Sequence, residues 1–387
     1  MASNNYIDLV RAEIYAGLKE VSNEPVGFIK AVNTSTGAEA AAIGDEIKIP
    51  SGTSGEVEDT PVGYSTPTEG NSDVNSEVMK ITKSRTVKID WKGEHQKSAR
   101  NSGVYDTVFS HQMADAFRKL RNEIERDAYF TSCKGASRAY GTKGTTPFGT
   151  SSNMSDLANV KGILDLNGAP KSNRTIVLSP AAEINLLSNQ MNMIKVNEAG
   201  SDALLRQGIV MPTYGFNVRS SFAGEELTAS TEAASYLVNG LAKKGSKEIA
   251  IDGGTGDILA GNIISFNGDK NKYVANEGST LTKLLLNPKG LLKDVADNTA
   301  ITVDGGYSAS VALHRNAVAL AIRPPAAPEF NGTKIDTALS REYVTDPLTN
   351  ITYEIAVYGG QRMLQFQVSV AWGVKAVNGE HIALLLG

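Results

Sequence analysis

The sequence predicts an α+β fold that carries an all-β insertion domain, and three observations support this class. Residues 109–128 place an apolar residue at every third or fourth position, which is typical of one long amphipathic helix. From about residue 155, helical segments alternate with short apolar strands such as 174–179. Residues 225–303 contain short strands separated by turn sequences such as Asn267-Gly268, which predicts a compact all-β unit.

The overall composition limits the possible functions. The 387 residues suit two or three compact units, and a hydrophobic fraction of 41% allows a sizeable core. The net charge of -4 lacks the basic excess typical of proteins that bind phosphate tightly, so we expect any DNA partner to be enclosed rather than gripped. Cys133 is the single cysteine, which excludes an intrachain disulfide and a cysteine-based zinc site and fits a reducing intracellular origin. We expect neither a signal peptide at the start nor a membrane-spanning segment.

The first hundred residues predict a short helix followed by a long hairpin arm. Apolar residues recur at helical spacing from Ile7 to Leu18, and Pro25 follows. Residues 49–79 are rich in Gly, Ser, Thr and Pro and contain six acids but no Lys or Arg. Residues 80–100 carry seven basic residues against two acids and alternate as a strand. Folded in half, this stretch reaches on the order of 50 Å as a hairpin with an acidic, flexible tip.

The remaining elements follow from periodicity. Asn101 or Ser102 is expected to cap the long helix, in which Arg121 and Glu125 have the i,i+4 spacing that favours pairing. Pro180 is expected to begin a further helix after the strand at 174–179. Near the C-terminus, residues 351–358 predict one strand and the alternation of residues 364–372 predicts another, with one apolar and one polar face.

The sequence shows no pattern typical of catalysis, and we predict no catalytic, cofactor-binding or metal-binding residues. The glycines and lysine between Gly135 and Lys143 lack the spacing of a phosphate-binding loop. The four histidines lack metal-binding helical spacing, and His111, on the long helix, is expected to be structural. Cys133 is interpreted as a small buried apolar residue at a helix end, because no base lies near it in the sequence. There is also no Gly-x-Ser-x-Gly motif.

The order of these parts resembles the major capsid proteins of tailed bacteriophages, which share the Hong Kong 97 fold. Four stretches resemble the family in amino-acid sequence: GDEIKIP, NGAPKSNRTIVLSPAA, HRNAVALAIRPPAAP and MLQFQVSVAWGVKAVNGEHIALLL. The resemblance covers nearly the whole chain and implies an N-terminal arm, an extended hairpin loop, a peripheral domain with a long spine helix, and an axial α/β domain. The β segment GDILAGNIISFNGDK resembles the insertion domain of coat proteins from short-tailed Salmonella-type phages.

This resemblance implies a division of the chain into seven segments. They are the N-terminal arm (1–44), the extended hairpin loop with its flanking strands (45–100), the peripheral domain with the spine helix (101–150), the axial domain (151–224), the all-β insertion domain (225–303), the continued axial domain (304–345) and the C-terminal long strands (346–387).

The expected function is structural: self-assembly of hexamers and pentamers into an icosahedral shell that encloses packaged double-stranded DNA. The resemblance implies a virion capsid that assembles in the host cytoplasm with a separate scaffolding protein and a portal protein. It implies no cofactor, no membrane and no sequence-specific DNA binding. Two alternatives stay open: an encapsulin-like nanocompartment, whose relatives usually lack an insertion domain, and an α/β hydrolase.

The change of charge sign along the arm predicts an electrostatic contact between subunits. The acids at the tip, Glu56, Glu58 and Asp59, are expected to contact a basic strand of the adjacent chain. The expected acceptors are Lys83, Arg85 and Lys88. Because salt screens such pairs over roughly 10 Å at 0.1 M, assembly is expected to weaken as salt rises.

Overall fold

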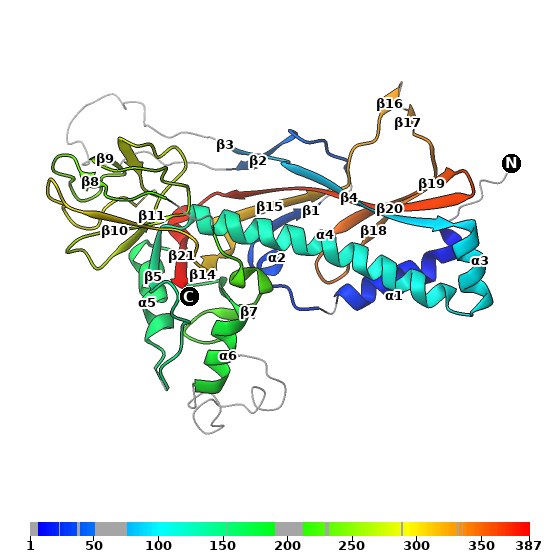
Figure 1. Cartoon of the computed structure of the whole chain (residues 1–387), viewed down its shortest axis with the longest axis horizontal. Coiled ribbons are helices and arrows are strands. Elements are labelled where there is room, and N and C mark those ends of the chain that lie inside the picture. Colours follow the sequence, from blue (N-terminus) through cyan, green and yellow to red (C-terminus); the bar gives the residue numbers. More distant parts are fainter. Residues whose placement is uncertain are drawn as a thin grey trace, which may run out of the picture.

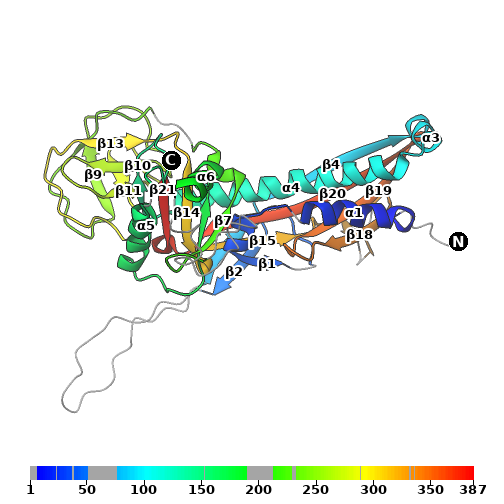
Figure 2. The same ribbon diagram turned by 90° about the horizontal axis from the view of Figure 1, so that it is seen from below.

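The computed structural model shows an elongated molecule built on two sheets (Figure 1). It describes residues 7–22, 24–36, 39–50, 76–151, 153–189, 212–228, 232–287, 289–330, 333–334 and 336–387. A six-stranded sheet and a long helix extend in one direction, and an eight-stranded sheet occupies the other end (Figures 1 and 2). This mixture of helices and sheets confirms the predicted α+β class.

The predicted long helix is α4 (Tyr105–Gly135), whose 31 residues span about 46 Å. Its apolar stripe is buried against the six-stranded sheet, where the ring centroids of Phe109 and Phe366 lie 4.8 Å apart. The expected start at Asn101 or Ser102 is wrong. A separate helix, α3 (Gly93–Asn101), precedes α4, and a turn at Gly103 with a φ of 67° separates the two. The strand expected to run through residue 100 therefore ends at Lys92.

The six-stranded sheet has the order β1-β15-β20-β19-β18, and β4 pairs with β20 as well. Its strands are β1 (Asn33–Thr36), β4 (Lys83–Lys92), β15 (Val318–Arg323), β18 (Ala338–Thr345), β19 (Thr352–Gly360) and β20 (Met363–Ala376). The strand β20 pairs with β4 over ten residues, with β19 over seven, and with β15 near its C-terminal end. The strand predicted from the alternation of residues 364–372 is thus confirmed, and it lies in the centre of the sheet.

The eight-stranded sheet has the order β13-β10-β11-β5-β21-β14-β6-β7. Its strands are β5 (Arg138–Gly141), β6 (Arg174–Leu178), β7 (Asn217–Ser220), β10 (Ile263–Phe266), β11 (Lys272–Val274), β13 (Ile301–Asp304), β14 (Ala309–His314) and β21 (Ile382–Leu386). Helices α5 (Ser155–Leu166) and α6 (Pro180–Asn189) contribute to the apolar cluster that also contains β6 and β21 residues. Pro180 begins α6, as the sequence predicts.

Residues 225–303 are built on strands but share a sheet with the rest of the chain. The strands β12 (Lys283–Leu285), β9 (Glu248–Asp252) and β8 (Leu237–Val238) form a separate three-stranded sheet. A cluster of buried apolar residues, drawn entirely from residues 233–301, forms a core of its own. However, β11 hydrogen-bonds to β5, so the eight-stranded sheet continues into this segment. The proposed domain boundaries stay a prediction.

The N-terminal segment lies along the long helix. After the short η1 (Asp8–Val10), α1 (Arg11–Ser22) packs against α4, and α2 (Phe28–Ala31) leads into β1 (Figure 1). The strands β2 (Glu46–Pro50) and β3 (Ser76–Lys80) pair antiparallel as the base of the hairpin. A further small hairpin consists of β16 (Glu329–Phe330) and β17 (Thr333–Lys334). Among the described residues, no helix has the length and hydropathy needed to cross a membrane.

Candidate inter-subunit surface

Two of the three predicted acceptor cations have carboxylate partners within their own subunit. Lys83 and Arg85 lie on the face of β4 that is turned towards α4, on the same side as Trp91. The Lys83 Nζ lies 2.8 Å from Asp127 Oδ1, and the Arg85 Nε lies 3.2 Å from Glu123 Oε1. These pairs attach β4 to the middle of α4 and occupy both cations.

Lys88 belongs to the opposite face of β4. It is exposed, as is Lys92 at the end of the strand, and within the described residues neither makes an ion pair. Between them Asp90 accepts a hydrogen bond of 2.7 Å from Gln365 Nε2 of β20. Lys88 is thus the predicted acceptor that makes no ion pair among the described residues.

The acidic side of the predicted contact lies outside the described residues. Glu56, Glu58 and Asp59 all fall there, so their positions stay a prediction. The base of the hairpin is held by Lys375 of β20, whose Nζ lies 3.2 Å from Glu77 Oε2 and donates a 3.0 Å hydrogen bond to the carbonyl of Val78. Lys375 therefore attaches the paired strands β2 and β3 to β20.

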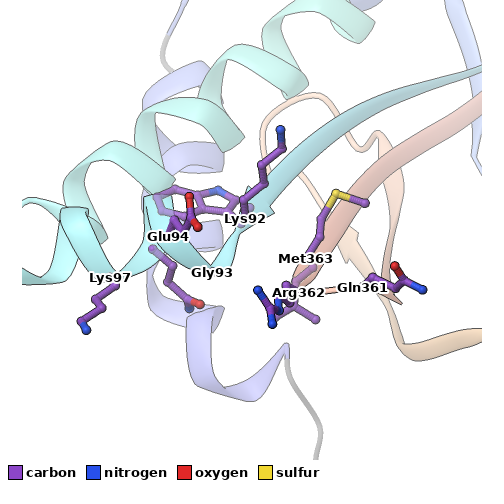
Figure 3. A pocket seen from close by; sticks show the side chains of 10 residues that line it. Lys92, Gly93, Glu94, Lys97, Gln361, Arg362 and Met363 are labelled. Atoms are coloured by element: carbon purple, nitrogen blue, oxygen red, sulfur yellow. The ribbon is translucent and has the colours of Figure 1, made fainter.

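A hollow of about 820 Å³ opens at the far end of the six-stranded sheet (Figure 3). Lys92 and Lys97 stand on the wall formed by β4 and α3, and Arg362 stands on the wall formed by the turn before β20 (Figure 3). A hydrogen bond links the two walls: the Gly93 N–H donates to the carbonyl of Arg362 at 2.9 Å. None of the nine residues of α3 is buried. The polar surface of this tip is therefore accessible to solvent.

A buried polar cluster attaches the N-terminal segment to α4, and the sequence analysis did not identify it. Glu125 is 2% exposed, and its carboxylate accepts the backbone N–H groups of Gly27 and Phe28 at 2.7 Å and of Ile29 at 3.0 Å. The Ser221 hydroxyl, from the segment after β7, donates to the same carboxylate at 2.8 Å. Glu125 therefore connects three separate parts of the chain at one point.

The second half of this cluster is formed by arginines of α4. Arg121 donates to the carbonyl of Val21 at 2.6 Å and also binds Glu24, and Arg118 Nε donates to Glu24 at 2.6 Å. Burial raises the pKa of Glu24, but the hydrogen bonds from Arg118 and Arg121 outweigh it and hold that pKa below its usual value. The expected pairing of Arg121 with Glu125 does not occur, because the N-terminal segment covers this face of α4 and supplies each with other partners.

The cysteine and histidine side chains considered for catalysis or metal binding differ in their surroundings. Cys133 is buried, and burial raises the pKa of its thiol to about 12, so the thiol stays protonated at neutral pH. The side chain of His111, which was expected to be structural, is 68% exposed and lies 3.8 Å from Glu20 Oε2, and its role stays a prediction. Within the described part of the chain, no group of three or more His, Cys, Asp or Glu residues is placed to hold a metal ion.

The comparisons with known proteins identify the fold. No family model matches the chain, and no curated protein does. A capsid structure of the cyanophage P-SCSP1u matches this chain with a TM-score of 0.50 and 12% sequence identity. The match covers 94% of this chain and 88% of that one. The mature capsid of bacteriophage PhiM1 gives 10% identity and a TM-score of 0.45 over 93% and 86% of the chains. A virus-like particle from Pyrococcus furiosus gives 9% identity and a TM-score of 0.43 over 98% and 99%.

The chain thus has the fold of tailed-phage capsid proteins, the Hong Kong 97 type, over most of its length.

Proposed function

We propose that this protein is the major capsid protein of a tailed bacteriophage. It self-assembles into hexamers and pentamers of an icosahedral shell that encloses packaged double-stranded DNA. The observation that carries the proposal is the capsid fold, which extends over 94% of the chain. The tip formed by α3 supports it, because the subunit itself buries none of the residues of this helix.

The partners follow from this role. A separate scaffolding protein directs assembly in the host cytoplasm, and a portal protein occupies one vertex of the virion shell. DNA is enclosed without sequence-specific contacts, which agrees with the net charge of -4, because tight phosphate binding requires an excess of basic residues.

The protein performs no catalysis in this proposal. The buried, protonated thiol of Cys133 argues against a cysteine nucleophile. The comparisons give the α/β-hydrolase alternative no support. An encapsulin-like shell is the weaker alternative, because it would share the capsid fold but leave the all-β segment 225–303 without a role.

Adjacent subunits are held together in part by the acidic hairpin tip. Glu56, Glu58 and Asp59 of one subunit contact the basic strand of the next, which carries Lys83, Arg85 and Lys88. Because Lys83 and Arg85 also bind Asp127 and Glu123 of their own subunit, Lys88 and its neighbour Lys92 carry the larger part of this contact.

Sedimentation velocity tests the proposed function. Purified protein, alone and with a scaffolding protein, is expected to form particles of many subunits, and electron micrographs of that fraction are expected to show closed or aberrant shells. The matched control is the triple variant Glu56→Lys, Glu58→Lys, Asp59→Lys, which is expected to stay folded but assemble poorly. A homogeneous monomer at every concentration, with or without scaffold, contradicts the proposal.

A further inference from the structure

The chain passes between its two large sheets three times, and the three passages meet at one place. Among the described elements, α4 leads into β5, β14 leads into β15 through η3 (Arg315–Ala317), and β20 leads into β21 through η4 (Gly379–His381). The N–H groups of Val377 and Asn378 both donate to the carbonyl of Ala317, at 2.8 and 3.1 Å. Gly379 approaches α4 so closely that a Cβ there would lie 2.5 Å from the Gly135 carbonyl oxygen. The three passages are therefore tied together at this joint, beside the apolar cluster that both sheets share.

Two histidines lie in contact inside the joint. His314 is the last residue of β14 and His381 is the last residue of η4. Their rings meet edge to face, with centroids 5.9 Å apart and an interplanar angle of 81°. His314 is 7% exposed. Each histidine thus sits on one of the two adjacent passages between the sheets.

One hydrogen bond of the joint requires a neutral imidazole. The His314 Nδ1 accepts the N–H of Asn316 at 3.3 Å, within η3. Only an unprotonated nitrogen can accept a hydrogen bond, so protonation of His314 at Nδ1 breaks this contact. The His381 Nδ1 is buried and has no hydrogen-bond partner, so a proton there would lack an acceptor.

The charged groups around the pair oppose a positive charge. Arg174 of β6 is 2% exposed, and its charge faces both histidines. Its carboxylate partner is Asp165 of α5, at 2.7 Å. Burial first, and then His381 and Arg174, lower the pKa of His314 below its ordinary value.

Charges of both signs lie near His381 on the η4 side. Glu380 raises the pKa of His381, whereas Arg174 and Lys289 lower it, and burial lowers it most. The Lys289 Nζ and the Glu380 carboxylate lie 3.9 Å apart and are both more than a third exposed, so their pairing is weak. Arg315, beside His314, is exposed and adds a further positive charge. Among the described residues, no carboxylate is thus placed to neutralise both rings when they are protonated together.

We propose that His314 and His381 form a proton-operated joint between the two sheets, which is closed while both rings are neutral and opens when they are protonated. Two imidazolium rings about 6 Å apart repel each other, and Arg174 repels both. Opening separates η3 from η4 and permits the six-stranded and eight-stranded sheets to change their relative orientation.

The direction of the pH effect follows from the lowered pKa values. The closed joint favours the neutral rings, so its stability is fully present above the ordinary histidine pKa of 6.5. As pH falls below 6.5 towards the lowered values, the open joint takes up protons more readily than the closed one. Mild acid therefore opens the joint without protonating most carboxylates of the subunit.

Hydrogen–deuterium exchange on the unassembled full-length subunit tests the joint independently of the capsid proposal. Exchange is compared at pH about 7.5 and about 5 after correction for intrinsic rates. Peptides covering residues 310–320 and 374–383 are expected to exchange at least ~10-fold faster at the lower pH. The double variant His314→Gln, His381→Gln is expected to lose this acceleration. The control double variant His95→Gln, His111→Gln changes two histidines that lie away from the joint, and it is expected to keep the acceleration.

Unchanged exchange at the joint, or equal acceleration in the His314→Gln, His381→Gln variant, overturns the proposal. If that variant does not fold, imidazole NMR titration of the unaltered protein decides. The two joint histidines are then expected to titrate below 6.5, with the midpoint of each shifted in the single variant of the other. Titration of both rings at or above 6.5 overturns the proposal, even if shells assemble normally.

Discussion

The Glu125 carboxylate of α4 accepts the backbone N–H of Phe28 at 2.7 Å, at the first residue of α2. Backbone N–H groups at the start of a helix have no partner within the helix, and a buried carboxylate satisfies them. A residue nearly a hundred positions away in the sequence therefore fixes the path of the N-terminal segment.

Replacing Glu125 is expected to destabilise the subunit strongly. Glu125→Ala leaves three buried N–H groups without an acceptor, so we expect the free energy of unfolding to fall by about 3 kcal/mol or more. The matched control is Glu123→Ala on the same helix, whose side chain is 32% exposed and whose loss is expected to cost less than about 1 kcal/mol. Urea denaturation of the two variants measures both. Equal effects would show that the buried carboxylate has no special role.

The attachment of the N-terminal segment is expected to weaken in acid. The pKa of Glu24 is lower in the folded subunit than its usual 4.5, so its contribution to stability is present above pH 4.5 and is lost as pH falls through the lowered value. Proteolysis between α1 and α2 is therefore expected to accelerate in that range. Glu24→Gln is expected to accelerate it at neutral pH already and to remove its pH dependence, while the more exposed Glu20→Gln is expected to change little. An unaltered pH dependence in Glu24→Gln would contradict this reading.

The segment 225–303 is expected to fold when expressed alone, because its buried apolar cluster lies within it. The strand β11 loses its pairing with β5 in such a fragment. We expect a dispersed amide NMR spectrum in which the N–H group of Lys272, which faces β5, exchanges faster than that of Tyr273, which faces β10 within the fragment. A random-coil spectrum of the fragment would refute its independence.

The contact between subunits is expected to depend on charge and salt. The triple variant Glu56→Lys, Glu58→Lys, Asp59→Lys is expected to keep its circular dichroism but fail to close shells, and assembly of the parent is expected to weaken as salt rises. Because Lys83 and Arg85 already bind acids of α4, recovery is expected from Lys88→Glu, Lys92→Glu. Lys83→Glu, Arg85→Glu serves as the comparison, since it places like charges beside Asp127 and Glu123 and is expected to destabilise the subunit itself. Light scattering follows assembly, and full assembly of the triple variant at every salt concentration would leave the acids without this role.

Periodicity predicted the elements whose packing is repetitive. The apolar stripe that ends at Ala128 and the alternation around Phe366 gave α4 and β20, because each element buries one continuous face. The fold class followed from these and from the turn sequences of the all-β segment.

The sequence did not predict features that depend on distant partners. Helix α3 has no apolar stripe because none of its residues is buried, so periodicity provided no signal for it. From its position outside the apolar stripe, Glu125 is expected at the surface of the helix, but the N-terminal segment covers it in the structure. The pairing of β11 with β5, and the contact of His314 with His381, join residues more than sixty positions apart, which no local pattern specifies.

Cryo-electron microscopy of the protein, expressed with and without a scaffolding protein, tests the central claim most directly. The account predicts closed icosahedral shells in which hexamers and pentamers are built from subunits with α4 and β20 as described here. Subunits that stay monomeric at every concentration, or that assemble into particles without icosahedral order under all these conditions, would contradict it.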